Sequence, residues 1–201
     1  MKEKSLAIQA GILASAGLTT KIIGFVYRIP MANILGNTGN GIYSVAFGIY
    51  GIVLTLSSYS MPISVSKLVS EKAAVGSKED SIKVFRVAML VSVIVGALAA
   101  MGLYFGADGL AGVYNKTGLE MPLKVLAPTT FIVSVLGCFR GYFQGYGNMV
   151  PTALSQIIEQ IINAVVSIIA AGQITVLIIG SNNEAALRAM GGTMGTCAGA
   201  M

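Results

Sequence analysis

The sequence predicts an all-α integral membrane protein, a bundle of about six transmembrane helices. Hydrophobic residues make up 55% of the chain and charged residues only 10%, whereas about a quarter of the residues in a soluble domain are charged. The mean hydropathy is +0.79. Apolar runs recur along the whole chain, and most are about as long as the ~20 residues that a helix needs to cross a membrane.

These runs predict five complete spans and the start of a sixth. They cover residues 5–34, 42–64, 84–106, 125–146 and 152–172, and a sixth segment begins near residue 184. The first run resembles a secretory signal with a cleavage site at Ala14-Ser15-Ala16, but the apolar pattern resumes at Ile22, so we expect a retained helix. Since the sixth segment is too short to span, we expect residues 1–201 to be part of a longer protein.

The connections between the spans are short and polar. Residues 33–41 form an uncharged turn, and residues 66–86 hold most of the charges, as in a solvated amphipathic helix followed by a turn. Glycines recur every fourth residue in two segments, a spacing that lets another helix approach closely. These are Gly137, Gly141 and Gly145, and Gly191, Gly195 and Gly199.

The distribution of basic residues predicts the orientation. Eight bases lie on one side of the predicted spans and three on the other, which places the N-terminus in the cytoplasm. The eight are Lys2, Lys4, Lys67, Lys72, Lys78, Lys83, Arg86 and Arg140, and the three are Lys116, Lys124 and Arg188.

Two further bases lie inside the first predicted span. Lys21 lies roughly 24 Å from the start of that helix, at 1.5 Å per residue, and Arg28 lies toward its far end. A charge in the hydrocarbon layer costs several kcal/mol, about 3 on insertion scales, so Lys21 must face the bundle interior, a wet cavity or a counter-charge.

The fifth predicted span carries a polar stripe. Thr152, Gln156, Glu159, Gln160, Asn163 and Ser167 recur at spacings of three and four, which places them on one face of the helix. Two interpretations stay open: a structural salt bridge between Lys21 and Glu159 with hydrogen bonds between helices, or the lining of a substrate pathway. Amides and hydroxyls suit sugars, and cations suit phosphates.

Several classes of function are not expected. The chain has no histidine, and Cys138 and Cys197 lie in apolar segments without CxxC spacing, so neither a metal site nor a disulfide framework is predicted. No P-loop, nucleophile elbow or paired carboxylates are present, so we expect no enzyme and no cofactor. The bases lie in short loops between apolar runs, so nucleic acid is not an expected partner.

Four segments resemble the polysaccharide-biosynthesis and lipid II flippase branch of the multidrug/oligosaccharidyl-lipid/polysaccharide exporter superfamily. They are KIIGFVYRIPMANILG (21–36), GIYSVAFGIYGIVLTLS (41–57), PISVSKLVSE (62–71) and FRGYFQGYGNMVPTALSQIIEQ (139–160). The resemblance implies a two-lobe, multi-pass transporter of the bacterial inner membrane that moves a lipid-linked oligosaccharide. It also implies that residues 1–201 are most of the N-terminal lobe, that the C-terminal lobe is their partner, and that Lys21 lies in a cationic central cavity. Gram-negative members have an arginine in the second helix where this chain has Leu54 and Thr55, so the resemblance implies a lipid-linked glycan rather than lipid II in particular.

Together these observations predict a substrate site and a function. The predicted substrate-binding residues are Lys21, Arg28, Gln156, Glu159, Gln160 and Asn163. The predicted function is a flippase for an undecaprenyl-pyrophosphate-linked glycan, and its partners are that substrate and membrane lipids. The alternatives are a cation-coupled multidrug exporter of the same superfamily and a membrane scaffold that does not transport.

Overall fold

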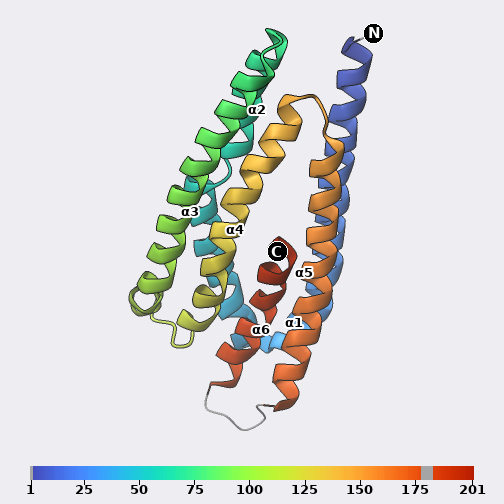
Figure 1. The fold of residues 1–201 in the computed structure, drawn as a ribbon. Coiled ribbons are helices and arrows are strands. Elements are labelled where there is room, and N and C mark those ends of the chain that lie inside the picture. Colours follow the sequence, from blue (N-terminus) through green and yellow to red (C-terminus); the bar gives the residue numbers. More distant parts are fainter. Residues whose placement is uncertain (1, 178–182) are drawn as a thin grey trace.

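The structure, a computed structural model, describes residues 2–177 and 183–201, with side chains from residue 7 onward. The described part of the chain is helical and contains no strand. Figure 1 shows the helices as one elongated bundle. Their bounds are α1 Lys2–Ser57, α2 Met61–Ala74, α3 Lys78–Val113, α4 Glu120–Gly145, α5 Val150–Leu177 and α6 Glu184–Ala200.

The expected all-α membrane class is confirmed, but the expected number of about six spans is not. In the described residues, four helical stretches are long and apolar enough to cross a membrane: Ala7–Ala74, which contains most of α1 and all of α2, and then α3, α4 and α5. The first two predicted spans fall within one of these stretches. The sixth segment, α6, has 17 residues and is shorter than a typical span.

The chain breaks inside α1 at a single glycine. Gly36 has φ 65° and ψ −179°, a backbone conformation that glycine adopts far more readily than other residues. The turn predicted over residues 33–41 is therefore confined to one residue, because helical structure continues on both sides. Figure 1 shows that the half before Gly36 runs along α5 and that the half after it returns toward α2.

The first glycine stripe packs α4 against α2. A Cβ atom at Gly141 would lie 2.8 Å from both the Pro62 carbonyl oxygen and Val65 Cβ, so only glycine fits without a shift. Val65 and Val69 of α2 are buried here. The prediction of close packing is thus confirmed, and α2 has one buried face and one exposed face, as in the amphipathic helix expected from residues 66–86.

The second glycine stripe packs α6 against α5. A Cβ at Gly191 would lie 3.0 Å from Ala171 Cα, and one at Gly195 would overlap Ser167 Oγ. These contacts draw α6 into the bundle between α4 and α5, as Figure 1 shows. The largest core side chains lie near this end of the molecule and include Met31, Leu35, Leu119, Leu123 and Leu126.

Candidate functional site

A cavity of about 470 Å³ lies between the two halves of α1 and the middle of α5. Four of the six predicted site residues line it, namely Lys21 and Arg28 from α1 and Gln160 and Asn163 from α5. Aromatic side chains complete the wall: Phe25, Tyr27, Tyr43 and Phe47. The structure therefore brings most of the predicted residues into one place.

The two cations of the cavity share one side of α1. Lys21 and Arg28 are seven residues apart, which is close to two helical turns, so both point to the same face. Within the described side chains, neither has a carboxylate at ion-pair distance. The cavity is consequently cationic, and its charge is not neutralised by the protein atoms around it.

The aromatic wall links the halves of α1. The hydroxyls of Tyr27 and Tyr43 lie 3.3 Å apart, close enough for a hydrogen bond across the break. Tyr43 packs on Phe47 with ring centroids 4.5 Å apart. Because Tyr43 is almost fully buried, these rings position the two helix halves and also give the cavity an apolar side.

The α5 side of the cavity is held by polar contacts to neighbouring helices. Asn163 Oδ1 accepts hydrogen bonds from Ser167 Oγ at 3.0 Å and from Thr196 Oγ1 of α6 at 3.3 Å. Gln160 faces α1, where its Nε2 atom lies 3.3 Å from the place that a Cβ on Gly24 would take. A glycine at position 24 thus makes room for the Gln160 amide beside the cavity.

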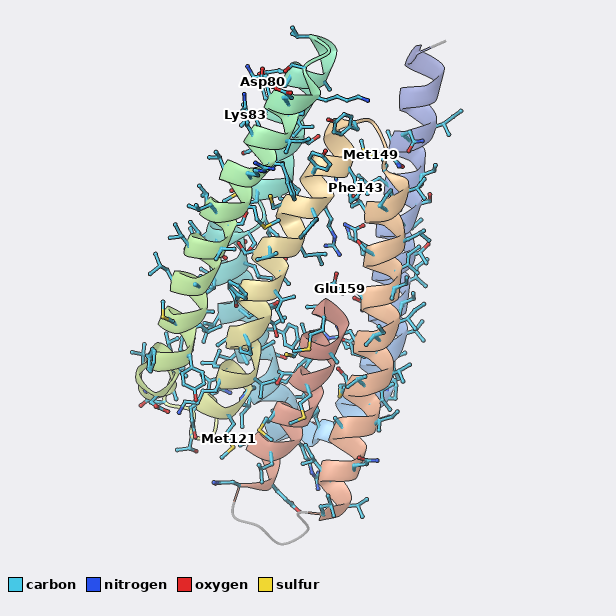
Figure 2. The ribbon with its side chains drawn as sticks, viewed as in Figure 1. Asp80, Lys83, Met121, Phe143, Met149 and Glu159 are labelled. Carbon is cyan, nitrogen blue, oxygen red and sulfur yellow. The ribbon has the colours of Figure 1, made fainter. Side chains whose placement is uncertain are left out.

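Glu159 does not pair with Lys21. Its Oε2 atom accepts a hydrogen bond from Arg140 Nη2 at 2.6 Å, and Arg140 Nε donates to Ser155 Oγ at 3.0 Å. Figure 2 shows Glu159 in the space between α4 and α5, near the end of α6. The interpretation of Lys21 and Glu159 as a salt bridge is therefore wrong: the counter-charge comes from the neighbouring helix.

This geometry also places two further residues. The Arg140 side chain is only 14% exposed and forms part of the α4–α5 contact. Gln156 is not among the residues that line the cavity. The sequence did contain a signal for the Arg140–Glu159 pair, because the base and the acid lie in successive helices. That proximity could have favoured Arg140 over the more distant Lys21 as the partner of Glu159.

Residues 6–193 match the family described as polysaccharide biosynthesis protein. The chain is 30% identical over 152 residues to stage V sporulation protein B of Bacillus subtilis (strain 168), which covers 75% of this chain and 29% of that protein. It is 29% identical over 163 residues to the lipid II flippase MurJ of the same organism, which covers 77% of this chain and 30% of that protein.

Solved structures share the fold. A multidrug resistance MATE family transporter of the MOP superfamily, in an outward-facing conformation, aligns with a TM-score of 0.74 at 15% identity. A MOP superfamily transporter from Pyrococcus furiosus aligns with a TM-score of 0.71, also at 15% identity. Each match covers 98% of this chain and 43% of the other. The chain thus spans less than half the length of the proteins that it matches.

Proposed function

Because the chain belongs to the polysaccharide biosynthesis protein family, we propose that it is part of a flippase that moves an undecaprenyl-pyrophosphate-linked glycan across the bacterial inner membrane. One relative is a lipid II flippase, and the two solved structures are transporters of the MOP superfamily. The observation that supports this substrate class is the cavity that Lys21 and Arg28 line without a neutralising carboxylate among the described side chains.

The chemistry of the lining suits both parts of such a substrate. Ammonium and guanidinium groups form charge-assisted hydrogen bonds with phosphate, and the guanidinium can do so in a bidentate manner. The amides of Gln160 and Asn163 and the Tyr27 hydroxyl can exchange hydrogen bonds with sugar hydroxyls. We expect the diphosphate near Lys21 and Arg28 and the glycan toward α5.

The charge of the cavity also discriminates between substrates. A cationic drug would meet two like charges, and no acid lines the cavity in the described part of the chain. A multidrug exporter is therefore less well supported than a carrier of anionic lipids. Alternating access would need a second bundle against which this one moves, and the relatives are long enough to supply it.

Replacing Lys21 tests the proposed function. In the full-length protein, Lys21→Ala should lower the rate of flipping at least about tenfold, because a hydrogen bond to a charged group contributes about 1.5–3 kcal/mol. Lys21→Arg should keep part of the activity, because the charge remains. The rate is measured on a fluorescent lipid-linked sugar in vesicles, together with the abundance of the protein in the membrane.

The matched control is Lys67→Ala, which removes one charge from the exposed face of α2. Its flipping rate should stay close to that of the wild type. If Lys21→Ala flips at the wild-type rate at equal abundance, Lys21 does not bind the substrate and the proposed site is wrong.

A further inference from the structure

A second polar pocket lies at the opposite end of the bundle from the N-terminus. It has a volume of about 460 Å³ and is formed by α1 just after its break and by the loop between α3 and α4. The α1 side supplies Asn37, Thr38 and Gly41, and the loop supplies Asn115, Lys116 and Thr117. An adjoining cavity of about 350 Å³ shares the three loop residues. Neither cavity includes a residue of the Lys21 cavity.

The backbone fixes the shape of this pocket. Asn115 has φ 49°, a left-handed conformation, and its N–H donates to the Gly112 carbonyl at 3.1 Å. The Lys116 N–H donates to the Ala111 carbonyl at 3.1 Å, which closes the end of α3. The loop therefore turns back at a defined point beside α1.

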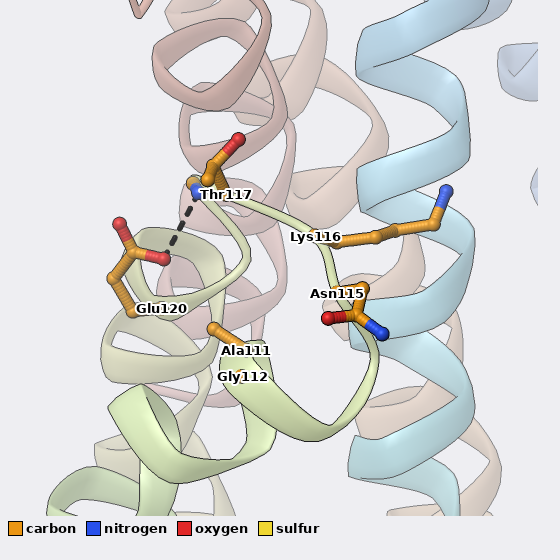
Figure 3. A pocket seen from close by; sticks show the side chains of 7 residues that line it. Ala111, Gly112, Asn115, Lys116, Thr117 and Glu120 are labelled. Atoms are coloured by element: carbon orange, nitrogen blue, oxygen red, sulfur yellow. Dashed lines mark hydrogen bonds between the residues drawn. The ribbon is translucent and has the colours of Figure 1, made fainter.

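Lys116 reaches across the pocket to α1. Its Nζ atom lies 3.4 Å from the position that a Cβ on Gly41 would occupy. Figure 3 shows the Lys116 side chain extended toward α1, with Asn115 beside it and Glu120 on the other side of the loop. The Glu120 carboxylate accepts a hydrogen bond from the Gly118 N–H at 3.0 Å, so it is engaged by the loop backbone.

The charge of Lys116 is not compensated by the described side chains. The two other bases assigned to this side of the membrane each have an acid: Lys124 lies 2.8 Å from Asp108, and Arg188 lies 3.6 Å from Glu184. Lys116 forms no such ion pair in the described part of the chain. The pocket thus combines one free ammonium group with two amides and two hydroxyls.

We propose that this pocket binds a phosphate group. A phosphate offers several acceptor oxygens, and the ammonium, amide and hydroxyl groups that line the pocket are possible donors to them. A carboxylate would use fewer of these donors. The volume exceeds that of a bare phosphate, and the loop joins the ends of α3 and α4, two helices that are long and apolar enough to cross a membrane. A loop at the end of two such helices is where we expect lipid headgroups. The phosphate comes either from a lipid headgroup or from a soluble molecule.

The test uses the full-length protein purified in a detergent that contains no phosphate. Native mass spectrometry counts bound phosphatidylglycerol, and phosphorus NMR measures binding of inorganic phosphate. Lys116→Gln should lower binding at least about fivefold, whereas Lys116→Arg should retain most of it. Thr38→Val removes one hydroxyl without changing the charge, and it should lower binding about threefold. This second variant keeps the test decisive if Lys116→Gln fails to fold, as judged by gel filtration.

The matched control is Lys124→Gln, which removes the same charge at the same end of the bundle but outside the pocket. Its binding should equal that of the wild type. Lys116-dependent binding of phosphatidylglycerol alone identifies a lipid headgroup as the source, and binding of both probes identifies the phosphate group itself. If neither probe binds, or if Lys124→Gln weakens binding as much as Lys116→Gln, the pocket does not recognise phosphate.

Discussion

At the residue scale, the bases inside the helices differ in whether they have a partner. Arg140 has Glu159 at 2.6 Å and Ser155 at 3.0 Å, whereas Lys21 faces a cavity. A paired charge holds two helices together, and an unpaired charge in a cavity is available to a ligand. This difference assigns Arg140 to the structure of the bundle, and it is the reason why we propose Lys21 as a ligand of the substrate.

The Arg140–Glu159 pair is expected to stabilise the protein. Glu159→Gln leaves Arg140, which is 14% exposed, without its counter-charge, and should cost about 3 kcal/mol of stability. The double variant Arg140→Met/Glu159→Leu should recover most of that loss, because neither charge then remains buried. Thermal denaturation followed by gel filtration measures the effect. Purely additive losses in the double variant would show that the two side chains act independently.

The sequence located the residues of the cavity better than it located their partners. Lys21 is conspicuous because a base in an apolar run needs an explanation, and helical periodicity placed Gln160 and Asn163 on one face. Periodicity describes one helix at a time. It therefore could not show that α5 turns Glu159 toward α4 and Gln160 toward α1, nor that Gln156 lies outside the cavity lining.

At the element scale, small residues decide which helices touch. Both glycine stripes were visible in the sequence, and both lie at close helix contacts: α4 on α2 and α6 on α5. The partners were not predictable, because a small residue permits an approach without selecting the helix that approaches. For the same reason the sequence did not show that Val65 and Val69 of α2 fill the space that the glycines of α4 leave.

Gly141 provides a test of this packing. Gly141→Ala places a methyl group 2.8 Å from Val65 Cβ and the Pro62 carbonyl, and overpacking of this kind typically costs about 1–3 kcal/mol. Gly102→Ala on α3 is the matched control, because nothing lies within 4 Å of its Cβ position. The control should be neutral or slightly stabilising, since alanine favours a helix over glycine. Equal denaturation temperatures for the two variants would contradict the α2–α4 contact.

At the scale of the whole molecule, composition and hydropathy were sufficient to predict an all-helical membrane protein. Composition and hydropathy are averages over long segments, and in a membrane protein the apolar environment of the lipid determines these averages. The path of the chain was harder to predict. The first reversal of the chain depends on one backbone conformation, at Gly36. The chain has 25 glycines, and the sequence does not show which of them breaks a helix.

The orientation of the bundle is a prediction that the structure makes easier to test. The tip between α2 and α3 and the end of α3 lie at opposite ends of the bundle in Figure 1, and Val75 and Val113 at these places are 83% and 77% exposed. Ser77 is less suitable for labelling, because its hydroxyl caps α3 by accepting from the Asp80 N–H.

With Cys138 and Cys197 replaced by alanine, a cysteine at position 113 should react with an impermeant maleimide in intact cells. A cysteine at position 75 should react only after the cells are permeabilised, because the eight-to-three excess of bases places its side in the cytoplasm. Both cysteines should react equally in detergent, which controls for accessibility. Labelling of position 75 but not 113 in intact cells would reverse the orientation, and the Lys116 pocket would then face the cytoplasm.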